Sequence, residues 1–277
     1  MAVDKAMEDG AANALGVTVS QRLTQGGQKT VLLVEQGTDT FVMKVMSTGP
    51  SLPDALKRAT REVELLKRID HPNVVKVASD LVELGEPSQG VAWLEEFLEG
   101  EDLADAITTP WDWDETKEMA LAVARGLSEM HRIRVVHRDL SARNIRRLTS
   151  GGYVVMDPGY ARHTGRSQLT AAGQPGTPGH LSPEHLHRYS GAPTAASDVF
   201  CVGILVHLAL TKGLPIPFTG DIGDYATRLA AVQVDDIKAA RPDLDDATVA
   251  VIRRCLHPQP ARRYRNGDRL AEALEAL

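Results

Sequence analysis

The chain has few cysteines, no long hydrophobic run and no surplus of positive charge, and each of these absences excludes a class of protein. Only two of the 277 residues are cysteine. They are Cys201 and Cys255, and both lie in apolar or helix-prone stretches. Two such residues cannot build a disulfide framework, so we expect small buried thiols in a reducing, cytoplasmic setting.

The hydrophobic runs are too short to predict a membrane protein. The longest run, residues 199–210, spans only about twelve residues and contains His207, whereas a bilayer needs roughly 20 apolar residues. The N-terminus has no basic segment followed by an apolar core, so we do not expect a secretion signal. We therefore expect no membrane segment.

The charge balance gives no support for a nucleic-acid partner. The formal net charge is -6 and the isoelectric point is near 5.9, whereas a phosphate-binding surface normally appears as a basic surplus. Hydrophobic residues make up 43% of the chain, which is enough for a large core in one large domain or two lobes.

The first part of the chain, up to about residue 97, is rich in predicted strands. Short β-prone runs alternate with Gly, Gln, Thr and Asp, and one stretch at 53–69 has helical spacing and ends before His71-Pro72. We expect a small antiparallel sheet with one helix. The predicted strands are 17–23, 29–36, 40–46, 74–77 and 91–97.

From Asp102 onward the periodicity is mainly helical. A short helix is followed by a long one at 114–130, and brief strands are predicted at 133–136 and 153–156. The later helices are predicted at 195–210, 226–231, 246–256 and 268–277. The sequence therefore predicts an α+β fold with its strands concentrated in the first part.

The residues that indicate chemistry are His137-Arg138-Asp139, followed by Asn144 and then by Asp157. A carboxylate can orient an attacking hydroxyl, and an amide with a second carboxylate can hold Mg²⁺ against the phosphates of a nucleotide. Asp139, Asn144 and Asp157 supply these groups in that order. This spacing predicts a phosphoryl-transfer centre.

These residues resemble the catalytic and metal-binding loops of protein kinases, with Asp157-Pro158-Gly159 in place of Asp-Phe-Gly. EEFLEGEDL resembles the family's interlobe hinge, and GTPGHLSPE resembles its substrate-docking segment. The resemblance covers residues 15–277 and indicates the eukaryotic-like, Hanks-type serine/threonine kinases of bacteria. It implies a bilobal kinase fold: an N-terminal tail (1–14), a small antiparallel β lobe with one helix (15–97) and a larger helical lobe (98–277).

The resemblance also implies a nucleotide site. Lys44 would be fixed by Glu62 and would position the α- and β-phosphates of ATP. Asp139, which would orient the substrate hydroxyl, and Asn144 would complete the set of catalytic residues. Asn144 and Asp157 would hold Mg²⁺, with Mn²⁺ as a possible substitute. Further nucleotide contacts are implied for the glycine loop and strand, the hinge and the ribose site, at Gly26, Gly27, Val31, Glu96, Leu98 and Asp102.

Other implied roles concern the loop after Asp157 and the support of the large lobe. Thr177 would approach Asp139, and Ser167, Thr170 or Thr177 would be phosphorylated, with Arg138 pairing with a loop phosphate. Asp198 would hydrogen-bond the backbone of the catalytic loop. Glu184 and Arg263 would form a buried ion pair.

The chain also departs from the family pattern. Thr24 and Lys29 occupy two of the three glycine positions of the phosphate loop, and Pro158 removes an aromatic side chain and an N–H donor. Ser141 stands where many serine/threonine kinases have a lysine, and the loop carries Arg143 instead, a placement that resembles tyrosine kinases. Glu95 and Arg146 lie at normally apolar positions around adenine. We predict that these two charges pair with each other or with solvent.

Together these features predict a cytoplasmic, ATP- and Mg²⁺-dependent serine/threonine protein kinase. Its partners would be protein substrates and a second copy of itself during autophosphorylation, with no nucleic acid and no membrane. Two alternatives remain open: a pseudokinase that binds a nucleotide or a partner, and a small-molecule phosphotransferase. The docking segment GTPGHLSPE argues against the second.

Overall fold

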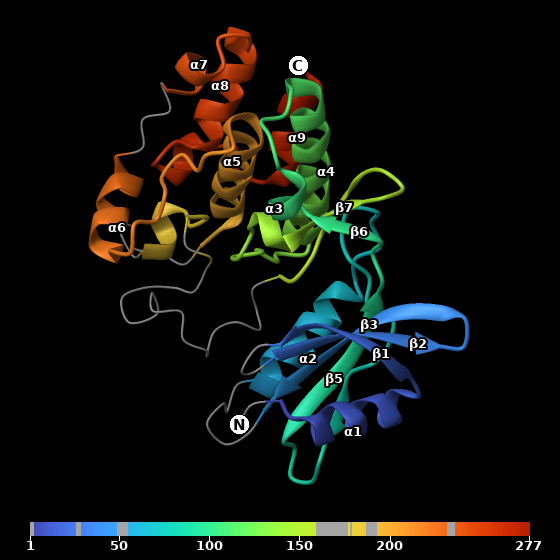
Figure 1. The fold of residues 1–277 in the computed structure, drawn as a ribbon. Helices are drawn as coiled ribbons and strands as arrows, with labels where there is room; N and C mark the ends of the chain where they lie inside the picture. The colour runs from blue at the N-terminus through green and yellow to red at the C-terminus, as the bar shows by residue number, and fades with distance from the viewer. Residues whose placement is uncertain are drawn as a thin grey trace. The chain divides into compact units, whose positions relative to one another are not determined.

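The computed structural model describes residues 3–25, 29–48, 55–158, 177, 179–186, 193–231 and 236–277. They divide into two compact units (Figure 1). The first comprises the described residues up to Asp70 together with Val75–Leu98. The second comprises His71–Val74 and the described residues from Glu99 onward.

The first unit is built on a five-stranded antiparallel sheet in the order β1-β2-β3-β5-β4. Strands β2 and β3 pair in a register that places Val31 opposite Lys44, and β3 pairs with β5 so that Lys44 lies opposite Trp93. The predicted antiparallel sheet is confirmed. Its strands are β1 (Thr18–Gln25), β2 (Lys29–Gln36), β3 (Asp39–Ser47), β4 (Val82–Leu84) and β5 (Gly90–Glu96).

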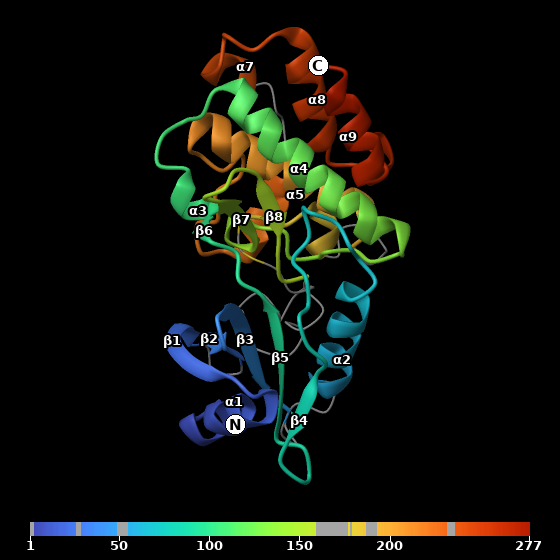
Figure 2. The same ribbon diagram turned by 90° about the vertical axis from the view of Figure 1, so that its right-hand side faces the viewer.

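The two faces of this sheet are covered by different helices, α1 (Lys5–Leu15) and α2 (Ala55–Leu66), as Figure 2 shows. Side chains alternate along β5, because successive residues of a strand point to opposite faces. Ala92 and Leu94 pack in the cluster that contains α1 residues, whereas Val91 and Trp93 pack with α2.

Helix α1 corrects the expectation that residues 1–14 form a tail. Asp4 caps the helix by accepting a hydrogen bond from the Met7 N–H, and Gly16 ends it with a left-handed backbone at φ 65°. Ala11 and Ala12 are buried against the sheet. Glu8 is only 1% exposed, and Arg22 of β1 donates to its two carboxylate oxygens at 2.7 and 2.5 Å.

The second unit is mainly helical, as predicted. Helix α5 is buried along nearly its whole length, and α4 packs against both α5 and α9 (Figure 1). The α-helices are α3 (Leu103–Ala106), α4 (Trp113–Arg132), α5 (Ala195–Thr211), α6 (Ile222–Ala230), α7 (Asp236–Ala240), α8 (Asp246–Cys255) and α9 (Gly267–Glu275). The 3-10 helices are η1 (Ala142–Asn144), η2 (Pro183–Leu186) and η3 (Pro260–Arg262).

A small sheet in the order β6-β7-β8 flanks the loop at residues 137–144, which carries the predicted catalytic residues and is called the catalytic loop below. Its strands are β6 (Gly100–Asp102), β7 (Ile145–Leu148) and β8 (Tyr153–Val155). Strand β7 begins directly after Asn144, and β8 ends two residues before Asp157, so the two strands position these two residues.

Two predicted strands are wrong. Residues 133–136 follow α4 in a turn in which Arg134 has φ 61°, so they do not extend into a ladder. Residues 74–77 form only isolated bridges, from Val74 to Val155 and from Val77 to Glu95. Among the residues that the structure describes, no helix is both long and apolar enough to cross a membrane.

Candidate active site

The catalytic loop is anchored by Asp198, near the N-terminus of α5. This fully buried carboxylate accepts hydrogen bonds from the backbone N–H of His137 at 2.7 Å and of Arg138 at 3.1 Å. His131 Nε2 lies 2.9 Å from the same carboxylate. Burial by itself raises the pKa of Asp198, but the hydrogen bonds from His131 and His137 outweigh it and leave the pKa below its usual value. The predicted role of Asp198 is confirmed.

Three histidines with buried rings support the loop through hydrogen bonds at both ring nitrogens. Each accepts a backbone N–H at Nδ1, from Gly267 to His131, from Asp139 to His137 and from Ser182 to His185. This leaves Nε2 of each ring as a donor. His131 donates to the Asp198 carboxylate, His137 to the Met156 carbonyl and His185 to the Arg138 carbonyl, each at 2.9 Å. Burial lowers the pKa of His185, which favours its neutral form.

These contacts hold two residues in a left-handed backbone that a side chain rarely adopts. Arg138 has φ 65° and Asp157 has φ 50°. The N–H of Arg138 is bound by Asp198 and its carbonyl by His185, while the Met156 N–H donates to the Asn144 carbonyl at 2.8 Å. The surrounding hydrogen bonds thus offset the strain at Arg138 and fix the peptide that precedes Asp157.

Asp139 lies at the centre of this loop and is 5% exposed. The Asn144 amide donates to the Asp139 carbonyl at 2.7 Å and to its carboxylate at 3.4 Å. The Thr177 hydroxyl donates to the other carboxylate oxygen at 2.9 Å. The predicted approach of Thr177 to Asp139 is confirmed, and the carboxylate has the geometry to orient a hydroxyl.

The side chains of Asn144 and Asp157 fit a hard divalent cation. The nitrogen of the Asn144 amide is committed to Asp139, so its oxygen faces away from that contact. Asp157 adds a half-buried carboxylate after the constrained Met156 peptide. An amide oxygen and a carboxylate are ligands that Mg²⁺ and Mn²⁺ accept.

Lys44 and its partners lie in the first unit. The Lys44 side chain is 4% exposed, and its ammonium lies 2.5 Å from one carboxylate oxygen of Glu95 and 2.6 Å from the other. The Trp93 indole N–H donates to Glu95 at 2.9 Å. Lys44 is thus paired with Glu95, a partner that was not predicted from the sequence.

Glu62, the predicted partner, is also in this cluster. It is 1% exposed on α2, and a carboxylate oxygen of Glu62 lies within 4.8 Å of one of Glu95. Two buried carboxylates therefore lie close together, and one of them, that of Glu95, is paired with Lys44. Like charges at this distance disfavour each other.

Comparison with known proteins adds to this geometry. Residues 17–274 match the protein kinase domain family. The chain belongs to this family. This kinase domain is 30% identical over 266 residues to a serine/threonine-protein kinase, drp72, of Corynebacterium efficiens, an alignment covering 91% of this chain and 49% of the relative. It is 29% identical over 266 residues to PknA of Corynebacterium glutamicum, covering 91% and 54%.

The kinase domain thus spans about half the length of these curated relatives. The predicted kinship with bacterial serine/threonine kinases is confirmed. Among solved structures, a mutant form of the Mycobacterium tuberculosis PknI kinase domain superposes with a TM-score of 0.69 at 21% identity, covering 94% of this chain and 95% of that one. This likeness confirms the bilobal kinase fold.

The kinase domain pairs its two unusual charges differently from the prediction. Glu95 binds Lys44 in the first unit, and Arg146 of β7 binds Asp102 of β6 at 3.0 Å in the second. Asp102 and Arg146 lie directly opposite each other in the antiparallel ladder, which explains their pairing. The prediction that Glu95 and Arg146 pair with each other is therefore wrong, because Lys44 and Asp102 are their partners.

Other predicted nucleotide contacts of the kinase domain lie on ordered backbone. The Glu96 N–H donates to the Lys76 carbonyl at 3.0 Å, so an adenine contact at Glu96 has to use its carbonyl. Val31 is opposite Lys44, and Leu98 follows β5 in a half-buried position. Four predicted residues lie outside those that the structure describes: Gly26, Gly27, Ser167 and Thr170.

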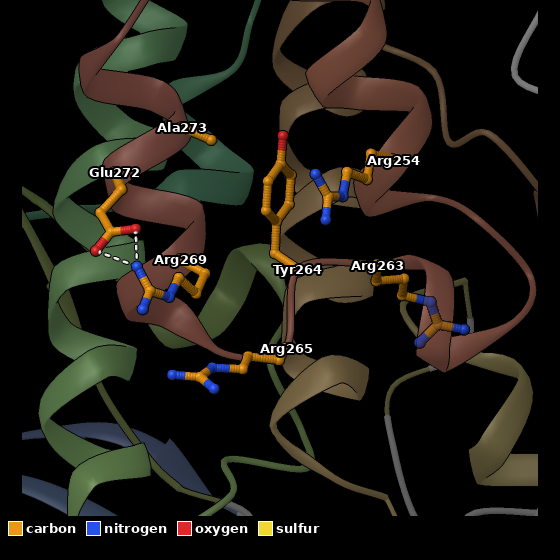
Figure 3. Close-up of a pocket in the computed structure, with 7 residues that line it drawn as sticks. All are labelled: Arg254, Arg263, Tyr264, Arg265, Arg269, Glu272 and Ala273. Carbon is orange, nitrogen blue, oxygen red and sulfur yellow. Dashed lines mark hydrogen bonds and ion pairs between the residues drawn. The ribbon is translucent and has the colours of Figure 1, made fainter.

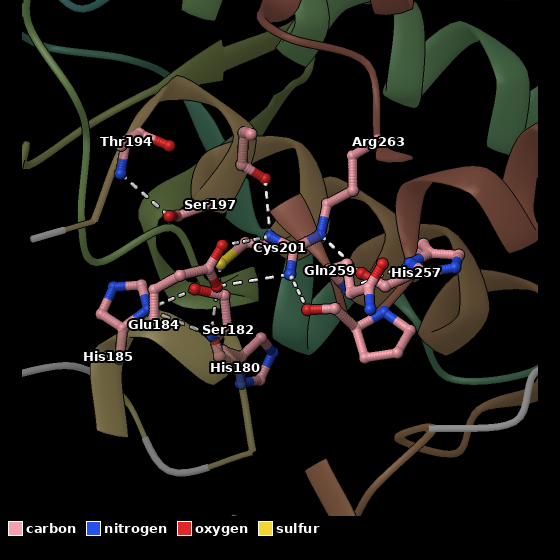
Figure 4. Close-up of polar contacts among 12 residues, drawn as sticks. His180, Ser182, Glu184, His185, Thr194, Ser197, Cys201, His257, Gln259 and Arg263 are labelled. Atoms are coloured by element: carbon pink, nitrogen blue, oxygen red, sulfur yellow. Dashed lines mark hydrogen bonds and ion pairs between the residues drawn. The ribbon is translucent and has the colours of Figure 1, made fainter. Parts of the chain in front are cut away.

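The predicted Glu184–Arg263 pair of the kinase domain is confirmed (Figure 4). Arg263 donates to Glu184 at 2.8 and 3.3 Å and also to the carbonyls of His257, Pro258 and Ala196. Cys201 donates to the His180 carbonyl nearby, and both cysteines are buried and free, as expected. Sequence reasoning missed the role of His185, because nothing in its spacing distinguishes it from a surface histidine.

Proposed function

We propose that the chain is an ATP-dependent protein kinase that transfers the γ-phosphate to serine and threonine hydroxyls of proteins. The observation that carries this proposal is the contact between Asp139 and the Thr177 hydroxyl at 2.9 Å. A substrate hydroxyl needs the same contact, in which a carboxylate orients the nucleophile and accepts its proton.

In this mechanism the residues mainly position charges. Lys44 contacts the α- and β-phosphates, while Glu62 and Glu95 hold its ammonium in place. Asn144 and Asp157 hold Mg²⁺, or Mn²⁺ in its place. The metal supplies positive charge that neutralises the phosphates during transfer.

The nucleotide is proposed to contact several other residues. The Glu96 carbonyl and the Leu98 backbone bind adenine, Asp102 approaches the ribose while it holds Arg146, and Val31 packs against the nucleotide. The glycine-loop contacts are proposed for Gly26 and Gly27. We further propose that a second copy of the chain serves as an autophosphorylation substrate, with phosphate accepted by Ser167, Thr170 or Thr177.

The proposed setting is cytoplasmic. It is supported by Cys201 and Cys255, which are buried and carry free thiols. Burial raises the pKa of Cys255 to about 12, which keeps this thiol protonated and unreactive at neutral pH.

The substrate class is tested by supplying the protein with labelled ATP, Mg²⁺ and three acceptors: a serine/threonine peptide, a tyrosine peptide and an aminoglycoside. We expect label on phosphoserine and phosphothreonine only, and none with Asp139→Asn. Label on the aminoglycoside alone would instead establish a small-molecule phosphotransferase.

A further inference from the structure

One segment of this acidic chain is strongly basic. Residues 253–269 contain six arginines and a single acidic residue, Asp268, although the whole chain has a formal charge of -6. The segment runs from the end of α8 through η3 to the first turn of α9. The buried pair with Glu184 accounts for one of these arginines, Arg263, and the proposed catalytic site uses none of them.

Four of these six arginines line a pocket of about 500 Å³ (Figure 3). This volume is within the usual range for small-ligand sites. None of the proposed catalytic or metal-binding residues lines it. Its lining residues are Arg254, Arg263, Tyr264, Arg265, Arg269, Glu272 and Ala273.

The arginines differ in how far the protein already uses them. Arg263 points away from the Tyr264 ring in Figure 3 and is committed to Glu184 and three carbonyls. Arg269 pairs with Glu272 in an ion pair whose side chains are 48% and 53% exposed. Such an exposed pair is weak and can be exchanged for a stronger anion.

Arg254 and Arg265 retain donors for a ligand. The guanidinium of Arg254 lies over the Tyr264 ring, 4.3 Å from its centroid, which fixes its plane. Arg265 makes no hydrogen bond or ion pair to any of the residues that the structure describes, and its side chain is exposed. The fixed plane of the Arg254 guanidinium is suited to bidentate binding of a phosphoryl group, and the exposed Arg265 side chain lines the other side of the same pocket (Figure 3).

We propose that this pocket binds a phosphoserine or phosphothreonine side chain of a protein segment, with Arg254 and Arg265 as the phosphate-binding residues and Tyr264 as the wall. The choice of a phosphorylated protein rests on the proposed function, because such segments are the products of that reaction. An open pocket of this size fits one phosphoryl group with its neighbouring residues. Nucleic acid presents a row of phosphates and a membrane presents a flat surface.

The test is the fluorescence anisotropy of a labelled peptide of about nine residues, with one central phosphothreonine flanked by alanine and glycine, titrated with the protein without nucleotide. We expect the phosphorylated peptide to bind at least about tenfold more tightly than its unphosphorylated form. Arg254→Ala and Arg265→Ala should each weaken binding by about tenfold. Arg265→Lys should retain part of the affinity, since lysine keeps the positive charge but lacks the paired N–H donors of the guanidinium.

Arg262→Ala is the matched control, because Arg262 is an exposed arginine of the same segment that does not line the pocket. It should change binding less than about twofold. Equal binding of the two peptides, or an equal loss with Arg262→Ala, would overturn the proposal. So would tighter binding of a single-stranded DNA or of anionic vesicles with the same dependence on Arg254 and Arg265. Since no nucleotide is present, the result is independent of kinase activity.

Discussion

At the residue scale, the proposed function gives Lys44 the task of holding the nucleotide phosphates, and its ammonium is already paired with Glu95. Glu95 binds it at 2.5 Å, and Glu62 approaches Glu95 within 4.8 Å. A phosphate that binds Lys44 has to compete with Glu95 and enters a site that already carries a buried negative charge. On the proposed function, Glu95 would hold the Lys44 ammonium in place and at the same time weaken the binding of a phosphate to it.

Glu95→Gln should tighten the binding of ATP with Mg²⁺ by about tenfold, or ~1.4 kcal/mol. The change removes one negative charge but keeps an acceptor for the Trp93 indole N–H. The dissociation constant can be measured by isothermal titration calorimetry, with Glu96→Gln as the neighbouring control. Unchanged or weaker binding would contradict this account of Glu95.

Glu95→Met tests whether this polar position also sets the choice of base. Because methionine is neutral and apolar, we expect the ratio of ATP to GTP affinity to change. Titration of the variant with both nucleotides measures this ratio. If both nucleotides bind with unchanged affinity, Glu95 has no part in recognising the nucleotide.

His185 makes the stability of the second unit depend on pH. Burial lowers its pKa in the folded state, with partial compensation from the Arg138 carbonyl and nearby acids, so the unfolded chain binds a proton more readily than the folded one. The free energy of unfolding should therefore fall as pH drops below about 6.5, by up to ~1.4 kcal/mol per pH unit. Urea unfolding between pH 7.5 and 5.5 measures this slope. His185→Gln should give a shallower slope, and an identical slope would refute the assignment.

At the element scale, helix α1 adds a layer to the sheet of the first unit. It starts before the region that matches the family, and it places Ala11, Ala12 and the Glu8–Arg22 pair against strands of that sheet. A short helix of this kind gains its stability from packing rather than from its own propensity. Its contribution can therefore be measured by disturbing the packed face alone.

Ala11→Asp should destabilise the first unit by about 3 kcal/mol or more, because it places a carboxylate without a partner at a position that is 0% exposed. Ala14→Asp, at an exposed position in the last turn of the same helix, should cost only about 1 kcal/mol, from helix propensity and the helix dipole. Chemical denaturation followed by tryptophan fluorescence compares the two. Equal effects would mean that α1 is not packed on the sheet.

The sequence predicted those elements whose signals are local. Strands β2 and β3 show β-prone residues between turn residues, and α4 and α5 have long apolar patterns with clear ends. Residues 133–136 were mistaken for a strand because Ile133, Val135 and Val136 are β-prone, whereas the backbone N–H groups of Arg134 and Val135 close the end of α4 by donating to the carbonyls of its last turn. Residues 1–14 were assigned to a tail because the family resemblance begins at residue 15, so it carried no information about the helix that precedes it.

In the candidate site as well, residues with a local sequence signal were predicted and contacts that depend on the fold were not. Asp139, Asn144 and Asp157 lie on one stretch of chain with fixed spacing, so their order could be recognised, and Asp198, Glu184 and Arg263 followed from motifs. The Lys44–Glu95 contact joins residues 51 positions apart in different strands. Only the β3–β5 register places them in neighbouring strands, and no local pattern predicts that register.

At the scale of the whole molecule, the proposed activity draws on both units. Lys44, Glu62 and Glu95 belong to the first, and Asp139, Asn144 and Asp157 belong to the second. A protein with either set alone could bind a nucleotide or a partner without transferring phosphate. The claim of catalysis therefore has to be tested on the transfer step itself.

The most direct measurement is transfer of labelled γ-phosphate from ATP with Mg²⁺ to the protein itself and to a generic basic protein substrate. Asp139→Asn is the control, because it removes the carboxylate that orients the hydroxyl while keeping the side-chain size. We predict incorporation that falls by at least about a hundredfold in the variant. No incorporation by the unmodified chain, together with measurable nucleotide binding, would contradict the account and indicate a pseudokinase.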